Sequence, residues 1–84
     1  MIEVLVEKLK VADVRAQLGL TQKQLAERAD VGEITVSNVE RAARSYVSRI
    51  VAYAILKALN EEREAQGLSL LQMGDLDWKV QGRE

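Results

Sequence analysis

The apolar positions of this chain recur mainly at helical spacing. Between positions 47 and 59 they fall at i, i+3, i+4, i+7 and i+8, a pattern that places them on one face of an α-helix. These residues are Val47, Ile50, Val51, Ala54, Ile55, Ala58 and Leu59. The pattern predicts an amphipathic helix from Val47 to Leu59, with room to continue to Gln66 before Gly67.

Two shorter helices, joined by a tight turn, are expected before it. Thr21 is a good N-cap, and Gln24 three positions later completes a capping box, in which two side chains satisfy free N–H groups of the first turn. This helix is expected to run to about Ala29, with an inner face formed by Leu25, Ala26 and Ala29. Residues 30–32 interrupt the pattern, and a second helix is expected from Glu33 to about Glu40, with Val36 and Val39 facing inward.

The two ends of the chain show weaker patterns. Alternating β-branched residues within positions 1–6 predict a short strand; they are Ile2, Val4 and Val6. Positions 7–18, from Glu7 to Leu18, are expected to form a helix that Gly19 ends. Near the C-terminus, residues 68–73 are expected to form one or two helical turns, and residues 77–80 a short strand.

The composition narrows the class of protein. At 84 residues we expect one domain, residues 1–84, with no room for a second core. Cys and His are absent, which excludes disulfides and thiolate metal sites and removes the commonest general base. A glycine-rich phosphate loop and a convincing carboxylate pair are also missing, so an enzyme has little support. We therefore expect no enzymatic activity and no cofactor.

The start of the chain bears on its location. No run of residues approaches the roughly 18 consecutive apolar positions that a membrane helix needs. Met1 is followed by Ile2-Glu3-Val4-Leu5-Val6, which lacks the basic start and the cleavage site of a signal peptide. We therefore expect a cytoplasmic protein.

The formal net charge of −1 argues against a nucleic-acid partner, because nucleic-acid-binding domains are often basic. The distribution of charge weakens this objection. Residues 21–50 carry five basic and four acidic side chains, whereas residues 51–84 carry four basic and six acidic side chains. The acidic excess therefore lies outside the two short helices.

Two short helices joined by a tight turn, the second with a polar exposed face, have the outline of a helix-turn-helix. Periodicity alone does not distinguish this arrangement from an ordinary helical hairpin, but the particular residues do. They form the run Arg15-x3-Gly19-Leu20-Thr21-Gln22-x2-Leu25-Ala26-x2-Ala29-x-Val31-x4-Val36-Ser37-x-Val39-Glu40-Arg41. On the basis of this run, the chain resembles the helix-turn-helix of phage repressors and Cro, the Xre family, over residues 11–59.

The resemblance implies a mostly α fold, a five-helix bundle of the lambda-repressor type with its core in residues 11–59. The strand-like start and the ending Asp75-Leu76-Asp77-Trp78 look like a subset of the family in which the two termini pair beside the bundle. We therefore expect a small antiparallel pairing of the N- and C-terminal strands. Residues 1–6 and 68–84 are expected to serve as strand and dimerisation elements.

In proteins of this type the second helix of the motif lies in the major groove of DNA. The resemblance implies four base-reading positions: Glu33, Ile34, Ser37 and Asn38. Asn38 would read adenine by a bidentate pair, Glu33 would accept from cytosine N4, and Ile34 would pack on a thymine methyl group. The alternative for Ile34 is that it packs on its own neighbours or on a partner subunit.

The resemblance also implies contacts to DNA phosphates from Gln22, Lys23, Arg41, Arg44, Ser45 and Tyr46. Gln22 would bind through its side chain or its backbone N–H, because a helix N-terminus presents free N–H groups and a positive dipole to an anion. Its alternative role is that of a simple capping residue. The loop that follows the second helix would lie along the DNA backbone, where Arg and hydroxyl side chains are the expected donors.

Arg15 and Glu40 match two positions that form a structural ion pair in the family, and we expect them to hold the fold together. The chain departs from the family pattern at three positions. Asp30 stands where Gly is frequent in the turn, and Asp tolerates left-handed geometry better than most residues. Gly32 replaces the usual Ser or Thr N-cap, and Ala42 stands where Gly often follows Glu40-Arg41.

The leading hypothesis is a sequence-specific DNA-binding transcriptional regulator, a repressor-like homodimer that reads the major groove of double-stranded DNA. Two-fold dimers that read two half-sites are the usual way in which a short recognition helix gains specificity. We expect a dimer interface of Leu76, Trp78 and Val80 beside the N-terminal strand, with Tyr53 and Leu70–Leu71 as further candidates. Trp78 could equally cover the chain's own core.

The alternative function is that of an antitoxin or protein-interaction module built on the same fold. The segment 61–78, which is acidic and apolar, motivates this alternative because it could bind a partner protein.

Overall fold

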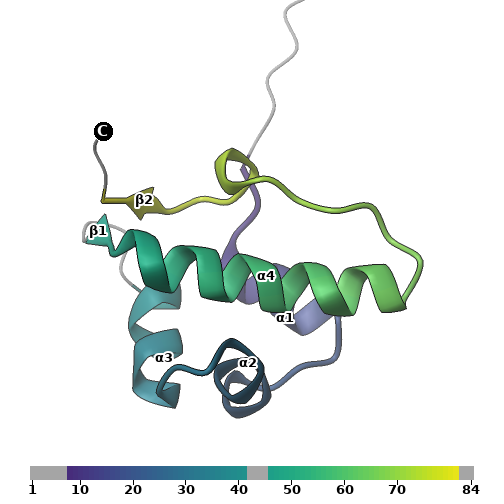
Figure 1. Cartoon of the computed structure of the whole chain (residues 1–84), viewed down its shortest axis with the longest axis horizontal. Coiled ribbons are helices and arrows are strands. Elements are labelled where there is room, and N and C mark those ends of the chain that lie inside the picture. Colours follow the sequence, from purple (N-terminus) through teal and green to yellow (C-terminus); the bar gives the residue numbers. More distant parts are fainter. Residues whose placement is uncertain (1–7, 42–45, 82–84) are drawn as a thin grey trace, which may run out of the picture.

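Four α-helices organise the part of the chain that the computed structural model describes, residues 8–41 and 46–81 (Figure 1). In chain order the elements are α1 (Val11–Gln17), α2 (Gln22–Ala29), α3 (Glu33–Arg41), the strand β1 (Tyr46–Val47), α4 (Arg49–Ala65), the 3-10 helix η1 (Met73–Asp75) and the strand β2 (Lys79–Val80). Helix α4 crosses the middle of the molecule, with α2 and α3 below it and α1 behind it (Figure 1). The segment after α4 turns back and returns above it, on the side away from α2 and α3.

The core lies where the four helices meet. Its largest fully buried side chains are Val14, Leu25, Val36, Ile55, Leu59 and Leu76. They come from α1, α2, α3, α4 and the residue after η1, and they belong to one continuous cluster. Because burial of one such side chain stabilises a fold by roughly 1.5–3 kcal/mol, this cluster fixes which face of each helix points inward.

The start of α2 has the predicted capping box. The Thr21 hydroxyl accepts a hydrogen bond from the Gln24 backbone N–H at 3.0 Å, and the Gln24 side-chain oxygen accepts one from the Thr21 N–H at 2.9 Å. Helix α2 ends at Ala29, as predicted, and Asp30 then takes the left-handed conformation, with φ of 58° and ψ of 45°. Asp adopts this conformation more readily than most residues, so the turn into α3 forms without a glycine at this position.

The boundaries of α3 and α4 differ slightly from the prediction. Helix α3 begins at Glu33, as predicted, and ends at Arg41, one residue later than expected. Helix α4 begins at Arg49 because Ser48 caps it: the Ser48 hydroxyl accepts from the Val51 N–H at 3.2 Å. Val47 therefore belongs to β1 and not to the helix. Helix α4 extends to Ala65, beyond the predicted Leu59 and into the stretch before Gly67 where we expected it to continue.

One residue of the predicted inner face of α4 points outward. Ile50 is 83% exposed, whereas Ala52, Ile55 and Leu59 are fully buried. Ile50 and Ile55 are five positions apart, and at 3.6 residues per turn their side chains point about 140° away from each other around the helix axis. The buried face of α4 is therefore turned toward Ala52 and Leu56, which lie outside the predicted face.

The region before α1 is extended where the sequence predicted helix. Helix α1 begins at Val11 rather than at Glu7, and Glu7 lies outside the described residues. Leu9 instead forms a parallel bridge with Leu76: the Leu9 N–H donates to the Asp75 carbonyl at 2.9 Å, and the Asp77 N–H donates to the Leu9 carbonyl at 2.7 Å. These backbone bonds to the C-terminal segment hold Leu9 in extended geometry.

The expected fifth helix is not formed by residues 68–73, so the described chain has four α-helices and a 3-10 turn. The Asn60 side chain on α4 explains why. Its NH2 group donates to the Leu71 carbonyl at 2.9 Å, and its oxygen accepts from the Leu71 N–H at 2.8 Å. Asn60 thus satisfies both backbone groups of Leu71 in an extended segment, where a helix would have paired them internally.

The C-terminal strand was expected to pair antiparallel with an N-terminal strand, but its partner among the described residues is a different strand, in parallel. β2 pairs in parallel with β1, which precedes α4, with Tyr46 opposite Lys79 and Val47 opposite Val80. The Gln81 N–H donates to the Val47 carbonyl at 2.8 Å. The predicted strand in residues 1–6 lies outside the described residues.

The three C-terminal residues that were expected on a dimer surface differ in how deeply they are buried. Leu76 is fully buried in the core of its own chain, so its side chain offers no surface to a partner and the expectation for it is wrong. Trp78 is half-buried against the core and donates its indole N–H to the Met73 carbonyl at 3.1 Å. Val80 is half-buried in β2. Trp78 therefore covers part of its own core.

Candidate nucleic-acid interface

The first three helices meet at one carboxylate, that of Glu40 near the end of α3. Arg15 on α1 donates from Nε to Glu40 Oε2 at 2.6 Å and from Nη2 to Oε1 at 3.2 Å. Gln22, the first residue of α2, donates from Nε2 to Oε1 at 2.8 Å. The Glu40 side chain is only 5% exposed. The ion pair between Arg15 and Glu40 is therefore present, and it fixes α3 against both other helices.

The same network reaches the turn between α1 and α2. Arg15 Nη1 donates to the Leu20 carbonyl at 2.8 Å, so its guanidinium joins that turn to α3. Carboxylate pairs of this kind, with two parallel N–H donors from one guanidinium, are directional as well as strong. The network thus sets the angle at which α3 leaves the body of the molecule.

Opposite this buried side, α3 presents an outward row of side chains. Ile34 is 75% exposed, Glu33 and Asn38 are exposed, and Ser37 is half-buried. Ile34 and Asn38 are four residues apart and therefore lie one turn apart on the same face of the helix. This exposure shows that Ile34 does not pack on the neighbours that the structure describes. Three of the four predicted base-reading residues are thus exposed, and Ser37 is half-buried.

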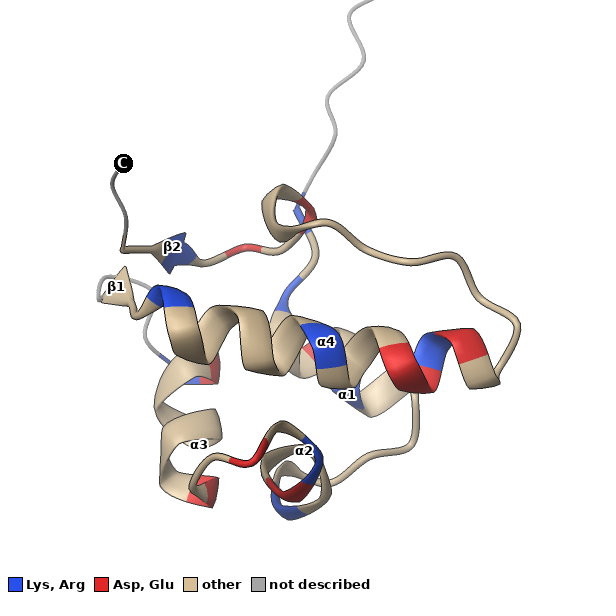
Figure 2. Ribbon diagram, in the orientation of Figure 1, with Lys and Arg blue, Asp and Glu red and all other residues tan. Residues whose placement is uncertain are grey.

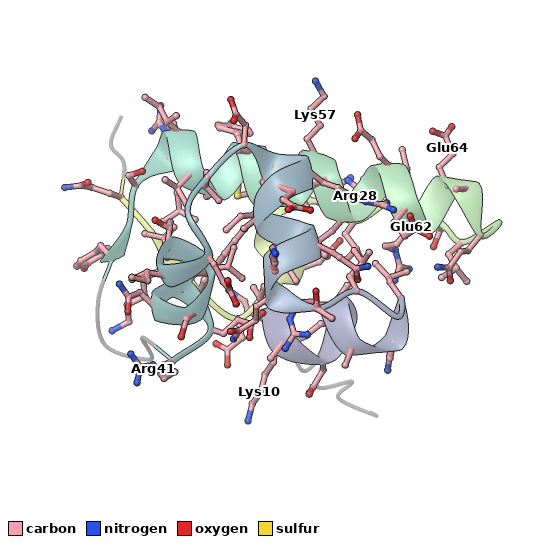
Figure 3. The ribbon with its side chains drawn as sticks, turned by 90° about the horizontal axis from the view of Figure 1, so that it is seen from below. Lys10, Arg28, Arg41, Lys57, Glu62 and Glu64 are labelled. Carbon is pink, nitrogen blue, oxygen red and sulfur yellow. The ribbon has the colours of Figure 1, made fainter. Side chains whose placement is uncertain are left out.

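An open cleft of about 540 Å³ lies beside this row, between α3 and the start of α4. Both apolar and polar side chains line it: Thr35, Asn38, Val39, Arg41, Tyr46, Val47, Ser48 and Val51. Arg41 Nη2 donates to Asn38 Oδ1 at 3.4 Å. Figure 3, seen from the side of α2 and α3, shows Arg41 at the edge of α3, pointing away from the ribbon. The cleft therefore gathers Asn38, Arg41 and Tyr46, three residues that the sequence had singled out.

Two polar residues of the cleft were missed in the sequence. Thr35 lies three positions before Asn38 on the same side of α3, and Ser48 caps α4. A signal for Ser48 exists, because Ser directly before a helical run is a common N-cap. It was obscured because the apolar pattern appeared to begin at Val47.

The remaining predicted phosphate contacts fall into two groups. Gln22 and Lys23 open α2, with Lys23 exposed and Gln22 half-buried because its side chain bonds to Glu40. Thr21 is the N-cap of α2, so Gln22 is not the capping residue. Arg44 and Ser45 lie outside the described residues.

A group of acidic side chains lies away from this surface, at the far end of α4. Figure 2 shows red residues at the C-terminal end of α4, which is the end remote from α3. There, Arg28 of α2 pairs with Glu62, and Gln66 Nε2 donates to Glu62 at 2.9 Å. These two bonds, that from Gln66 first and that from Arg28 second, lower the pKa of Glu62 below its ordinary value. Part of the acidic excess is thus engaged in joining α2 to α4.

The described residues offer little for other kinds of site. They contain no group of three acidic, Cys or His side chains placed to hold a metal ion. None of the helices in residues 8–41 and 46–81 has both the length and the apolar character required to cross a membrane.

The capped α2, the left-handed turn and the outward row of α3 together define a helix-turn-helix domain. Residues 11–66 match the family model described as Helix-turn-helix, HTH_3. The match spans 56 of the 84 residues, and the chain belongs to this Cro/C1-type (Xre) family of DNA-binding domains, which are not enzymes. No match was found among curated proteins or among solved structures.

Proposed function

We propose that this protein is a sequence-specific, cytoplasmic DNA-binding transcriptional regulator that places α3 in the major groove. The observation that carries the proposal is the outward row of α3, in which a large apolar side chain, Ile34, is 75% exposed beside the exposed amide of Asn38. An apolar residue so exposed on a fixed helix is well suited to contact a base methyl group, and an amide to pair with a base edge.

The base-reading roles follow from the chemistry of the four outward residues. Asn38 pairs with adenine, Ile34 contacts a thymine methyl group, and Glu33 accepts from the amino group of cytosine. Ser37, which is half-buried, donates to or accepts from a neighbouring base.

Phosphate contacts flank this row on both sides. On one side, Gln22 and Lys23 stand at the N-terminus of α2, where free N–H groups and the helix dipole favour an anion. On the other side, Arg41 and Tyr46 line the cleft between α3 and α4. Arg44 and Ser45 are proposed as further donors from the sequence alone. Such contacts set the register of the protein on the duplex, while base contacts specify the sequence.

We further propose that the regulator acts as a repressor-like homodimer on two half-sites. One α3 helix reads few base pairs, and each good bidentate contact supplies about 1–3 kcal/mol of discrimination. The proposed dimer surface contains Trp78 and Val80, which are half-buried near the end of the chain. Sedimentation of the free protein and of its DNA complex will show whether two copies bind together.

Selection of bound sequences from random DNA tests the proposal directly. We expect one enriched motif, and binding to it that weakens steeply as salt rises, because phosphate contacts release counterions. Asn38→Ala should relax base preference at one position of the motif, whereas Arg41→Ala should weaken binding to all sequences about equally. If no DNA binds even at low salt, the proposed function is wrong.

A second candidate function is a protein-interaction module such as an antitoxin. Leu68 and Leu70, in the extended segment after α4, are 44% and 59% exposed, and exposed apolar side chains close together in a segment can form part of a docking surface. This function is tested by co-purification with the protein that the adjacent gene encodes, compared between the wild type and the Leu68→Ser/Leu70→Ser variant. A partner retained equally by both forms would exclude these leucines as its docking site.

A further inference from the structure

The Gln22 side chain has a defined orientation in this fold. Its Nε2 lies 2.8 Å from Glu40 Oε1, and a carboxylate can only accept hydrogen bonds. The amide must therefore turn its NH2 group, and not its oxygen, toward Glu40. An NH2 group carries two hydrogens, and the bond to Glu40 needs only one of them.

We infer that Glu40 is a positioning residue, which holds the Gln22 amide so that its second N–H can donate to a DNA phosphate. The inference rests on the proposed DNA-binding function and deepens it. Phosphate oxygens, like carboxylate oxygens, only accept hydrogen bonds, so the two N–H groups of one amide can serve both acceptors at once. Gln22 is the first residue of α2, where the helix dipole also favours an anion.

Glu40 does not itself contact the phosphate. Its side chain is 5% exposed and has no donor, and its negative charge alone would repel an anion. Arg15 removes this difficulty, because its guanidinium pairs with both carboxylate oxygens, at 2.6 and 3.2 Å. The neutralised pair can therefore stand behind Gln22 and orient it without opposing the approach of DNA.

A purely structural role for the contact between Gln22 and Glu40 predicts something different. In that case, loss of the contact would change the stability of the fold and weaken DNA binding evenly along the site. The positioning role predicts a loss at a single phosphate, because only the contact made by Gln22 depends on the orientation of its amide.

The test uses the full chain and duplexes that carry the selected site with one phosphate at a time replaced by a neutral methylphosphonate. In the wild type, neutralisation of the phosphate bound by Gln22 should weaken binding by roughly tenfold, the size expected for one hydrogen bond to a charged group. Gln22→Met removes both N–H donors and keeps a side chain of similar length. The phosphate bound by Gln22 is the one whose replacement weakens binding of the wild type but not of this variant. Lys57→Met, at an exposed position of α4 outside the proposed DNA contacts, is the matched control and should leave the response at that phosphate intact.

The decisive variant is Glu40→Asp, which keeps a carboxylate near Arg15 but shortens it so that Gln22 loses its acceptor. We expect this variant, although it retains Gln22, to lose the response at the same phosphate. A folded Glu40→Asp protein with the full wild-type response at that phosphate would overturn the inference. A wild type that binds no DNA would instead refute the proposed function.

A measurement on the wild type decides the matter if Glu40→Asp does not fold. The two side-chain NH2 protons of Gln22 should give separate, downfield NMR signals in the DNA complex, one for each acceptor. The methylphosphonate duplex should return one signal to the position typical of a free amide and leave the other in place. If neither signal differs between the two duplexes, the amide does not bridge the carboxylate and the phosphate.

Discussion

The two sides of α4 are held by different kinds of contact. Below it, α2 and α3 are fixed by buried apolar side chains and by the carboxylate of Glu40, which takes donors from Arg15 and Gln22. Above it, the C-terminal segment is held largely through its backbone, by the amide of Asn60 and by the strand-like bonds of Leu9. One side of α4 is therefore held by side-chain contacts and the other side mainly by backbone hydrogen bonds. Four substitutions can test this difference.

The largest effect is expected from Arg15→Ala. This change leaves the nearly buried carboxylate of Glu40 without its partner, and loss of one member of such a pair costs about 3–5 kcal/mol. Urea unfolding followed by circular dichroism measures the loss. Arg28→Ala, which removes the more exposed ion pair with Glu62, is the matched control and should cost far less. If the two variants lost the same free energy of unfolding, the Glu40 carboxylate would not be the main contact that holds α2 and α3 in place.

Leu76→Ala should have the next largest effect. Leu76 is fully buried although it lies in the C-terminal segment, which is held mainly by backbone hydrogen bonds. Truncation of a buried leucine lowers the free energy of unfolding by about 2–5 kcal/mol. Leu70→Ala, at a position that is 59% exposed, should change the free energy of unfolding by less than about 0.5 kcal/mol. A small effect at Leu76 would mean that this segment is not part of the core.

Asn60→Ala should destabilise the protein by about 1–2 kcal/mol, because two hydrogen bonds to Leu71 are lost while its backbone can rehydrate. Hydrogen exchange should become faster at the Leu71 N–H and stay unchanged at the Leu25 N–H on α2. Asn60→Asp should not restore this stability, because it keeps the acceptor for the Leu71 N–H but sets a second carboxylate oxygen against the Leu71 carbonyl oxygen, and the two acceptors repel each other. Uniform acceleration of exchange along the chain would show that the two halves open together.

The smallest effect concerns the pH dependence of the link between α2 and α4. The pKa of Glu62 is lowered in the folded state, mainly by the hydrogen bond from Gln66 and then by that from Arg28. Its contribution to stability is therefore complete above the pKa of the unfolded chain and disappears as the pH falls through the lower pKa of the folded state. The difference in unfolding free energy between wild type and Glu62→Gln should be constant near neutral pH and shrink below about pH 4. A difference that persists unchanged to pH 3 would contradict this assignment.

The helix-turn-helix half could be predicted because its signals are local. Thr21 and Gln24 cap each other across three residues, and Asp30 forms its left-handed turn without help from distant parts of the chain. The pair of Arg15 and Glu40 spans 25 residues, and only the resemblance to a known family pointed to it. Spacing alone would not have joined these two charges.

The other half could not be predicted because its contacts are distant in sequence and involve the backbone. Nothing in the residues around Leu71 indicates that Asn60 will satisfy both of its backbone groups. The register of Val47 beside Val80 likewise depends on how the segment after α4 returns the chain to β1. At the candidate site, Thr35 and Ser48 were missed for a similar reason, since the cleft exists only once α3 and α4 are placed together.

The division of α3 into an inward and an outward row has a consequence for how such a protein can change over evolutionary time. Val36 and Glu40 carry the attachment of α3 to the fold, whereas Ile34 and Asn38 contribute little to it. Mutations in the outward row can therefore accumulate with little penalty in stability, while those in the inward row are removed by selection. Duplicated copies of this chain can thus diverge in what they bind and still keep a common scaffold.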